Sequence, residues 1–302
     1  MSSYHQPVML KECLEALNIR ANGTYVDVTF GGGGHSRAIL EMLGPEGKLI
    51  AFDQDPDAKQ NIIDDERFHF VDQNFSFLKN QLRFLGVQKV DGILADLGVS
   101  SHQFDAADRG FSIRFDASLD MRMDQLREKD AKLVLNTYSE QDLHKIFGMY
   151  GEVHNAKTLA SVIVKARLIE PIEHVGAFKE LIRPLVKRGK ENQYYAQVFQ
   201  ALRIEVNEEL EVLKEFLQQS VHVLKPGGRL VVMSYHSLED RLVKNFIQKG
   251  KFSGELEKDI YGNVNTPLEA VSRKAITATE EEIKINNRAR SAKLRIAEKK
   301  DE

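Results

Sequence analysis

Cysteine is almost absent from this sequence: Cys13 is the only one among 302 residues, and tryptophan is missing altogether. One cysteine excludes an intramolecular disulfide and a metal site built from several thiolates, and it agrees with a reducing compartment. No run comes near the ~20 apolar residues that a membrane-spanning helix needs. The start of the chain, Met1 to Pro7, lacks the basic residues and apolar segment of a signal peptide. We therefore expect a cytoplasmic protein without a metal site.

The sequence also lacks a strong net charge. Its 42 Lys and Arg residues nearly balance its 45 Asp and Glu residues, which leaves a net charge of -3. A nucleic-acid partner would therefore have to meet a local basic patch rather than a global positive field. Most charged runs are only solvated faces, and the group in the turn-like stretch 183–190 is the strongest candidate. The candidate groups are Arg109, Arg114 and Arg122; Arg183, Lys187, Arg188 and Lys190; and Arg288, Arg290, Lys293 and Arg295.

Short runs of β-branched and apolar residues alternate with helical patterns over the first hundred residues. Strands that alternate with helices predict a parallel sheet with crossover helices. The expected strands are 24–29, 48–52, 68–72 and 90–94, and the expected helices include 8–17 and 36–43.

The pattern changes in the middle of the chain. Residues 131–182 show helical periodicity without a convincing strand, and strand patterns return at 229–233 and 292–297, after a long amphipathic helix at 207–224 and a turn at 225–228. We therefore predict an α/β sheet interrupted by a helical insert. The expected main domain is discontinuous, with residues 1–104 and 201–302, and the insert covers residues 105–200.

A cluster of glycines, Gly31 to Gly34, follows the first expected strand and opens a helix. Such a turn lets backbone approach a nucleotide-like ligand closely. A dinucleotide fingerprint needs a further glycine, but Ser36 and Arg37 stand at the positions where it would fall. The alternative is a loop for S-adenosylmethionine, with Asp27 before the glycines and Asp53 at the next strand end as acceptor of the ribose hydroxyls. A third possibility is a plain tight turn, with Asp53 as a helix cap.

Two further residues stand at expected strand ends. Phe75 follows the third strand and either stacks on an adenine ring or belongs to the core. Asp96 follows the fourth strand, where the carboxyl ends of parallel strands line the ligand crevice, and would face the transferable methyl group. Amino-group methyltransferases often carry the tetrapeptide Asp/Asn-Pro-Pro-Tyr/Phe at this place. This chain has its first residue, Asp96, but neither the prolines nor the aromatic residue. Asp96 is our candidate for the group that accepts a proton from the amine, and a structural cap is the alternative.

Taken in order, the motifs of the chain resemble those of the bacterial ribosomal RNA small-subunit methyltransferase H family. The similar segments are His5-x-Pro7-Val8-Met9-Leu10, Thr29-Phe30-Gly31-Gly32-Gly33-Gly34-His35-Ser36, Phe52-Asp53-x-Asp55-Pro56, Asp91 to Ser101, Arg109-Gly110-Phe111-Ser112, Leu119 to Asp124, Phe199 to Asn207, Ser234 to Arg241, and Arg288-Ala289-Arg290-Ser291.

The resemblance implies a class I methyltransferase sheet, Rossmann-like, whose helical insert recognises the substrate. It implies transfer of the methyl group of S-adenosyl-L-methionine to the N4 amine of a cytosine in small-subunit ribosomal RNA or the assembling small subunit. It places the cofactor contacts on Gly33, Gly34, His35, Asp53, Phe75, Asp96 and Gln103, of which His35 and Gln103 come from the resemblance alone. Gly32 departs from the Arg or Lys that the family often has there.

A target base must leave its stack to be modified, and Phe111 or Tyr235 could stack on it. The run Leu238 to Arg241 either helps to form the base pocket or simply begins a helix. Rival classes remain: an NAD-dependent oxidoreductase, a non-catalytic RNA-binding protein on the same fold, and a DNA amino-methyltransferase. A homodimer is possible, and neither the oligomeric state nor the target nucleotide follows from the sequence.

Overall fold

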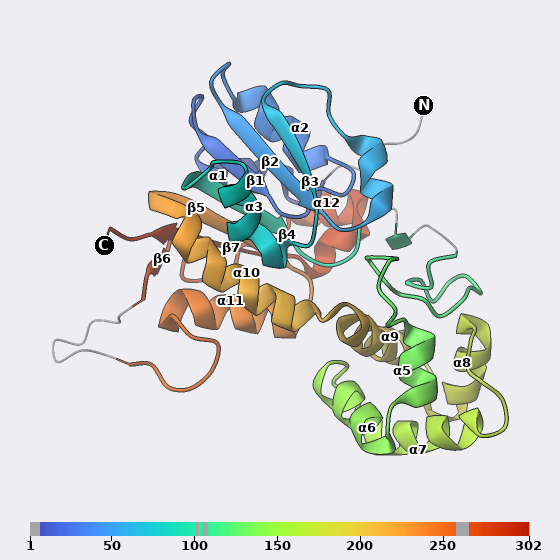
Figure 1. The fold of residues 1–302 in the computed structure, drawn as a ribbon. Helices are drawn as coiled ribbons and strands as arrows, with labels where there is room; N and C mark the ends of the chain where they lie inside the picture. The colour runs from blue at the N-terminus through green and yellow to red at the C-terminus, as the bar shows by residue number, and fades with distance from the viewer. Residues whose placement is uncertain (1–6, 101–102, 105–107, 258–265, 302) are drawn as a thin grey trace. The chain divides into compact units, whose positions relative to one another are not determined.

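A computed structural model describes residues 7–100, 103–104, 108–257 and 266–301 (Figure 1). The motif residues His5 and Ser101 lie outside these ranges. The chain forms two compact units, one made of Met1–Gly98 with Leu210–Glu302 and the other of Val99–Glu209. Among the described residues no helix is long and apolar enough to cross a membrane.

A seven-stranded sheet with the order β3-β2-β1-β4-β5-β7-β6 organises the first unit. The pairs among β3, β2, β1, β4 and β5 are parallel, whereas β7 is antiparallel to β5 and β6. This order is that of class I methyltransferases, so the predicted α/β fold is confirmed. The strands are β1 (Thr24–Asp27), β2 (Lys48–Asp53), β3 (Phe68–Asp72), β4 (Val90–Asp96), β5 (Leu224–Ser234), β6 (Leu268–Ala270) and β7 (Lys293–Lys299).

The strand order reverses between β1 and β4, because β2 and β3 extend the sheet on one side of β1 and β4 and β5 extend it on the other. In open α/β sheets a ligand crevice forms at such a switch point, beyond the carboxyl ends of the strands. The residues that follow β1, β2 and β4 therefore meet at one edge of the sheet.

Helices cover both faces of this sheet (Figure 1). Apolar residues of α3, α10 and α11 pack with Ile93 and Val232 on one face. Residues of α1 and α2 pack with Leu94 and Val231 on the other. Adjacent strand residues thus enter opposite cores, which explains the continuous apolar runs in the sequence. The helices are α1 (Leu10–Leu17), α2 (Gly34–Met42), α3 (Leu78–Phe84), α10 (Glu209–Val223), α11 (Ser237–Lys249) and α12 (Glu280–Ile285), with the 3-10 turns η1 (Pro56–Asn61), η2 (Phe75–Phe77) and η4 (Asn287–Ser291).

Two details of the sheet differ from the sequence-based expectation. Strand β6 was not expected, because a strand of three residues is too short to show periodicity. The turn expected at 225–228 lies within β5 instead. Gly227 adopts φ 72° there, and the β4–β5 register shifts between Val90 and Gly92, so the chain makes an irregularity in the ladder.

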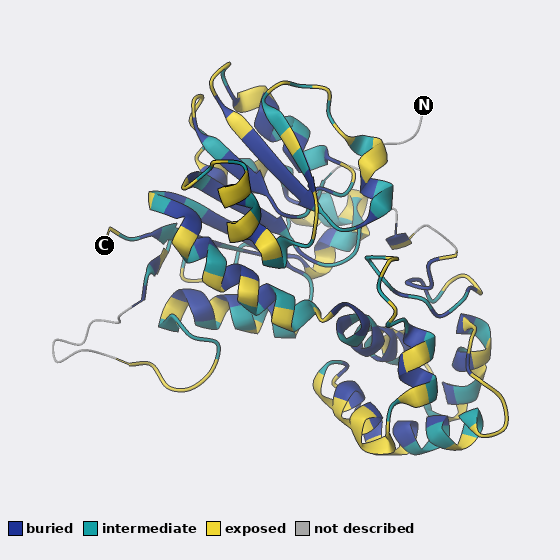
Figure 2. Cartoon of the chain, viewed as in Figure 1, coloured by how far each residue is buried: buried dark blue, intermediate teal, exposed yellow. Residues whose placement is uncertain are grey.

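The second unit is helical and has its own core, built around side chains such as Phe147 and Phe178 (Figure 2). Its described residues contain no strand beyond an isolated bridge between Ser118 and His174, which confirms the predicted helical insert. Its elements are α5 (Ala131–Thr137), α6 (Glu140–Met149), α7 (Ala156–Arg167), α8 (Val175–Ile182), η3 (Arg183–Leu185) and α9 (Glu191–Asn207).

The ends of this unit differ from the expected 105–200. The expected end at residue 200 falls inside α9, whose Val198 and Leu202 belong to the same core. Since a helix is not divided in the middle of its buried face, the division comes after Glu209.

Candidate active site

Asp27, the last residue of β1, is buried and ties the strand to the helix that follows. Its Oδ2 accepts a hydrogen bond of 2.7 Å from the Ser36 hydroxyl, and its Oδ1 accepts one of 3.1 Å from the Thr29 backbone N–H. These bonds hold the first turn of α2 against β1. They therefore fix the path of the glycine loop between the two elements.

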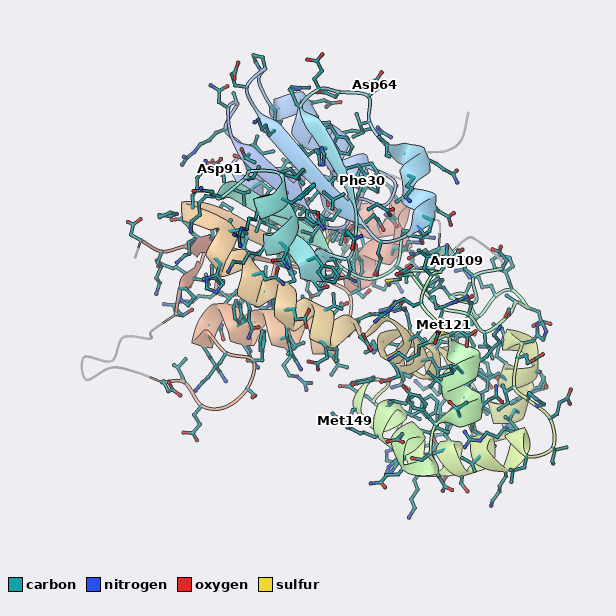
Figure 3. The ribbon with its side chains drawn as sticks, viewed as in Figure 1. Phe30, Asp64, Asp91, Arg109, Met121 and Met149 are labelled. Carbon is teal, nitrogen blue, oxygen red and sulfur yellow. The ribbon has the colours of Figure 1, made fainter. Side chains whose placement is uncertain are left out.

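The loop itself depends on the absence of side chains. Gly31 and Gly33 have φ of 49° and 74°, in the region that glycine adopts at no steric cost. A Cβ on Gly33 would lie 2.9 Å from the ring of Phe30, the residue labelled in Figure 3, and a Cβ on Gly34 would collide with the Pro7 ring. A Cβ on Gly32 would meet nothing within 4 Å. Position 32 can therefore carry a side chain without disturbing the loop.

Asp53 lies at the carboxyl end of β2 and faces the loop. Its Oδ2 accepts a bond of 2.7 Å from the Gly31 N–H, and its Oδ1 accepts one of 2.8 Å from the Asp55 N–H. Burial raises the pKa of Asp53 to about 6, against the opposing effect of these hydrogen bonds. The alternative role of Asp53 as a helix cap is wrong, because Asp55 caps η1 through the Asp57 N–H. Each Asp53 oxygen keeps a lone pair for a further donor.

Asp96 lies at the carboxyl end of β4, across the switch point from the loop. Its Oδ1 accepts a bond of 2.7 Å from the Tyr235 hydroxyl, and its own N–H donates to Thr29 Oγ1 at 2.7 Å. The Asp96 side chain is 24% exposed. Burial raises its pKa to about 6, although His35 and the Tyr235 hydroxyl act in the opposite direction. Asp96 is thus a carboxyl group poised to gain or lose a proton near neutral pH.

His35 belongs to the first turn of α2 and is buried between Asp96 and the N-terminal segment. Its Nδ1 lies 3.8 Å from Asp96 Oδ2, and its Nε2 lies 3.2 Å from the Val8 carbonyl oxygen. The structure therefore brings together two of the predicted site residues, His35 and Asp96, which are distant in the sequence.

Phe75 begins η2, just beyond β3. Its ring is partly buried and lies edge-on to Phe216 of α10, with 5.4 Å between the ring centroids. The neighbouring Asn74 caps η2 through the Ser76 N–H, and Asp72 pairs with Lys59 at 2.5 Å. Phe75 thus packs against the core on one side, and its contact with an adenine ring stays a prediction.

Gln103 belongs to the second unit. Its side-chain Oε1 accepts a bond of 3.0 Å from the Ser100 N–H, and its own N–H donates to the Ser100 hydroxyl at 3.1 Å. These bonds close the turn that follows the Asp96 segment. The role of Gln103 toward the cofactor stays a prediction.

The run Leu238 to Arg241 is the start of a helix, one of the two alternatives that the sequence allows. Helix α11 begins at Ser237, and His236 and Glu239 form a reciprocal capping box. Asp240 pairs with Arg295 of β7 at 2.6 Å. The acidic residues of this run therefore hold α11 in place.

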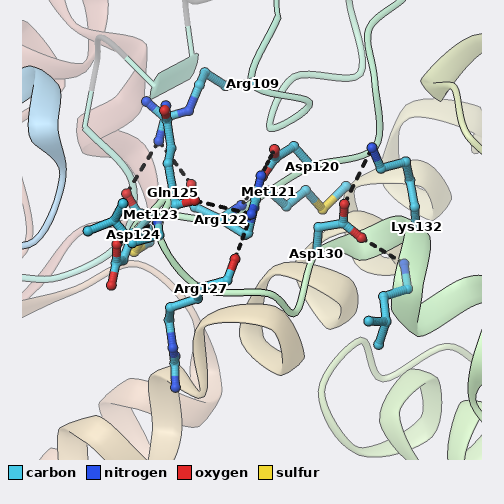
Figure 4. Close-up of polar contacts among 12 residues, drawn as sticks. Arg109, Asp120, Met121, Arg122, Met123, Asp124, Gln125, Arg127, Asp130 and Lys132 are labelled. Carbon is cyan, nitrogen blue, oxygen red and sulfur yellow. Dashed lines mark hydrogen bonds and ion pairs between the residues drawn. The ribbon is translucent and has the colours of Figure 1, made fainter.

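Two of the expected RNA-binding arginines instead stabilise the irregular segment before α5 (Figure 4). Arg122 donates to both carboxylate oxygens of Asp120, at 2.8 and 2.7 Å, and to the Arg127 carbonyl. Arg109 is buried and donates to the Arg122 carbonyl at 2.9 Å, with Phe111 beneath its guanidinium group. The expectation that Arg109 and Arg122 form a basic patch is therefore wrong, because their donors are used inside the fold. Phe111 is equally unsuited to stack on a base, since it lies in the helical core.

The basic residues around 183–190 are different. Lys187, Arg188 and Lys190 are exposed, and within the described part of the chain no ion pair engages them. Arg183 is exposed and pairs with Glu180 at 3.2 Å. Lys187, Arg188 and Lys190, defined as the 187–190 basic patch, are therefore our candidate for a phosphate-binding surface.

The sheet order, the glycine loop after β1 and the carboxylates after β2 and β4 define a class I methyltransferase. The profile of the MraW methylase family matches residues 2–300. The chain is 60% identical over 298 residues to the Ribosomal RNA small subunit methyltransferase H of Cytophaga hutchinsonii, covering 98% of this chain and 99% of that one. It is 58% identical over 296 residues to the protein of the same name from Flavobacterium johnsoniae, covering 98% of each chain.

The chain belongs to the MraW methylase family. This membership confirms the resemblance noted in the sequence, the predicted enzyme class and S-adenosylmethionine as the methyl donor. An oxidoreductase of the same general fold is thereby excluded.

Proposed function

We propose that this enzyme transfers the methyl group of S-adenosylmethionine to the N4 amine of a cytosine in small-subunit ribosomal RNA. The name of the full-length relatives supports small-subunit ribosomal RNA as the substrate, and the family resemblance supports the N4 amine of a cytosine as the acceptor. The observation that carries the chemistry is the Asp96 carboxyl at the end of β4, held by Tyr235 and next to the glycine loop.

The residues at the switch point fit S-adenosylmethionine. The glycine loop presents backbone without side chains, and the carboxylates of Asp53 and Asp96 suit a ligand that carries a sulfonium and an ammonium group. We propose that the ribose hydroxyls donate to Asp53, whose oxygens keep free lone pairs. Gly33, Gly34, His35, Asp53, Phe75, Asp96 and Gln103 are the proposed cofactor contacts.

The proposed reaction needs help at the amine, because the N4 lone pair is delocalised into the cytosine ring. S-adenosylmethionine supplies a sulfonium-bound methyl group, so that the N4–CH3 bond forms as the S–CH3 bond breaks and its electron pair returns to sulfur. Asp96 accepts the proton that leaves N4, a step that contributes typically ~10²–10⁴-fold in rate. Alignment of the base supplies part of the ~7–11 kcal/mol that proximity can provide. The ionised form of Asp96 is therefore the active one.

The helical unit is the proposed substrate-recognition domain, with the 187–190 basic patch on ribosomal RNA phosphates. Contacts of this kind give an affinity that falls as salt rises. The proposed location is the cytoplasm, where small subunits assemble. A homodimer stays a prediction, which sedimentation velocity measures directly.

The test of the function is tritiated methyl transfer from S-adenosylmethionine to purified small-subunit RNA and to small subunits, with the product nucleoside identified by mass spectrometry. We expect N4-methylcytosine from the wild-type enzyme. Transfer of no label, with RNA still bound, would indicate a non-catalytic RNA-binding protein. With a DNA duplex assayed in parallel, label in the DNA alone would point to a DNA amino-methyltransferase.

The role of Asp96 is tested separately with Asp96→Ala. We expect activity to fall at least 100-fold, while calorimetry reports whether S-adenosylmethionine still binds. A variant that binds the cofactor and keeps near wild-type activity would exclude Asp96 as the proton acceptor.

A further inference from the structure

Tyr235 follows the last residue of β5 and stands beside the end of β4. The two strands are parallel neighbours, with Met233 opposite Asp96 in the register. The pairing continues one step beyond β4, because the Leu97 N–H donates to the Met233 carbonyl at 2.9 Å. Tyr235 therefore reaches the same edge of the sheet as Asp96, and its hydroxyl donates to Asp96 Oδ1 at 2.7 Å.

The Tyr235 backbone is bonded to the first turn of α11, and its ring lies near Gly98. The Tyr235 N–H donates to Glu239 Oε2 at 2.9 Å, and Glu239, in the first turn of α11, is only 3% exposed. Gly98 has φ 97°, and a Cβ there would lie 3.4 Å from the Tyr235 ring. The segment that follows β4 thus lies beside the ring whose hydroxyl is bonded to Asp96.

The two oxygens of Asp96 consequently have different surroundings. Oδ1 accepts the Tyr235 hydroxyl, whereas Oδ2 faces His35 Nδ1 at 3.8 Å, beyond hydrogen-bond range. The second nitrogen of His35 lies at the Val8 carbonyl. Oδ2 is therefore the oxygen with room for a proton from the substrate.

We infer that Tyr235 is a positioning residue for methyl transfer: its hydroxyl holds Asp96 Oδ1, so that Oδ2 is presented to the amine proton. This inference rests on the proposed function, and it replaces stacking on the base as the role of Tyr235. The hydroxyl acts through Asp96 and needs no contact with either substrate.

The charges around Asp96 predict a pH signature for this role. The pKa of Asp96 is about 6, because burial, Asp27 and Glu239 raise it while His35 and the Tyr235 hydroxyl lower it. The neighbouring Cys13 thiol stays neutral, because burial raises its pKa well above the usual range. Loss of the Tyr235 hydroxyl should therefore raise the Asp96 pKa. Since activity needs the ionised carboxylate, the acid limb of the rate profile should move to higher pH.

The experiment compares Tyr235→Phe with wild type in methyl transfer from pH 5 to 9. Loss of a hydrogen bond to a charged acceptor should lower kcat about tenfold or more. It should also move the acid limb of the rate profile to higher pH by about one unit. We expect KM for both substrates to stay within about twofold, because a phenyl ring keeps the packing. The matched control is Tyr138→Phe, which removes a comparable bond of 2.6 Å to Glu205 in the helical unit and should leave the acid limb in place.

A measurement without catalysis separates this inference from the proposed function. In protein labelled with carboxyl ¹³C-aspartate, and with the Asp96 signal assigned by Asp96→Asn, we expect the Asp96 pKa to be higher in Tyr235→Phe than in wild type. If Tyr235→Phe does not fold, the measurement is made on the wild-type protein instead, by following the resonance of the Tyr235 hydroxyl proton against pH. This resonance should shift as the pH falls through about 6, the Asp96 pKa.

The outcomes are distinct. An active wild type whose Tyr235→Phe variant keeps its kcat and its acid limb overturns the role of Tyr235 and leaves the proposed function standing. A wild type that transfers no methyl group overturns both. An Asp96 signal that titrates identically in both proteins, or a Tyr235 hydroxyl resonance that ignores pH, overturns the role whatever the activity.

Discussion

Replacing Asp96 with asparagine should stabilise the protein while it removes activity. The folded-state pKa of Asp96 is about 6, against an ordinary value of 3.8, and burial is the main cause. At 1.36 kcal/mol per pH unit, this difference costs the folded state about 3 kcal/mol once the pH is above 6. Because the side chain is 24% exposed, solvent screening reduces the cost to about 1–2 kcal/mol.

The sign follows from proton binding. A carboxyl whose pKa is higher in the folded state binds its proton more tightly there, so its favourable contribution exists below pH 3.8 and is lost as the pH rises through about 6. Asparagine has the same shape, can accept the Tyr235 hydroxyl and carries no charge. The stabilising effect of Asp96→Asn should therefore appear between pH 4 and 6 and reach a plateau above that.

The assay is thermal unfolding of the wild type and of Asp96→Asn, each without cofactor, at intervals from pH 4.5 to pH 8. At the average unfolding entropy per residue, about 1–2 kcal/mol corresponds to a rise of roughly 2–3 °C in melting temperature for a chain of 302 residues. We expect this rise at pH 8 and a much smaller one at pH 4.5. An equal or lower melting temperature for Asp96→Asn at pH 8 would refute the argument that burial of this charge strains the fold.

Three further perturbations test other parts of the structure. Gly34→Ala places a methyl group against the Pro7 ring, and calorimetry should show at least tenfold weaker binding of S-adenosylmethionine. In the control Gly32→Ala the added methyl group meets nothing within 4 Å, so this variant should keep the wild-type melting temperature. Arg122→Ala removes charge-assisted bonds to a carboxylate and to carbonyl groups, so denaturant unfolding should show a loss of about 2–4 kcal/mol; a loss below 0.5 kcal/mol would contradict its internal role. Lys187→Glu should weaken RNA binding and flatten its salt dependence without changing the melting temperature; unchanged affinity at every salt concentration would exclude this surface.

Much of the site could be predicted from the sequence, because strand ends are local features. The β-branched run before the glycines and the apolar runs before Asp53 and Asp96 mark parallel strands, and parallel strands end at one edge of a sheet. The glycines at 31 and 33 indicate positive φ, which the structure contains. The enzyme class follows from these features together with the family motifs.

The expected basic patch shows what a linear pattern cannot reveal. A charged side chain looks the same in the sequence whether it faces solvent or satisfies carbonyl groups inside a loop. Arg122 and Lys187 were both candidates, with the group around Lys187 favoured, yet the linear pattern did not show that Arg122 is bonded to Asp120 and to backbone carbonyls while Lys187 is exposed. Only the path of the chain around each side chain separates the two cases.

By itself the sequence determined the α/β fold, the helical insert, the glycine loop and the carboxylates at the ends of β2 and β4. Only the tertiary structure decided what surrounds those carboxylates. Tyr235 and Asp96 stand 139 positions apart, and the parallel pairing of β4 with β5 brings them to 2.7 Å. The physical reason is that periodicity reports which face of an element is buried, whereas the partners of a buried charge depend on which elements become neighbours in the folded chain.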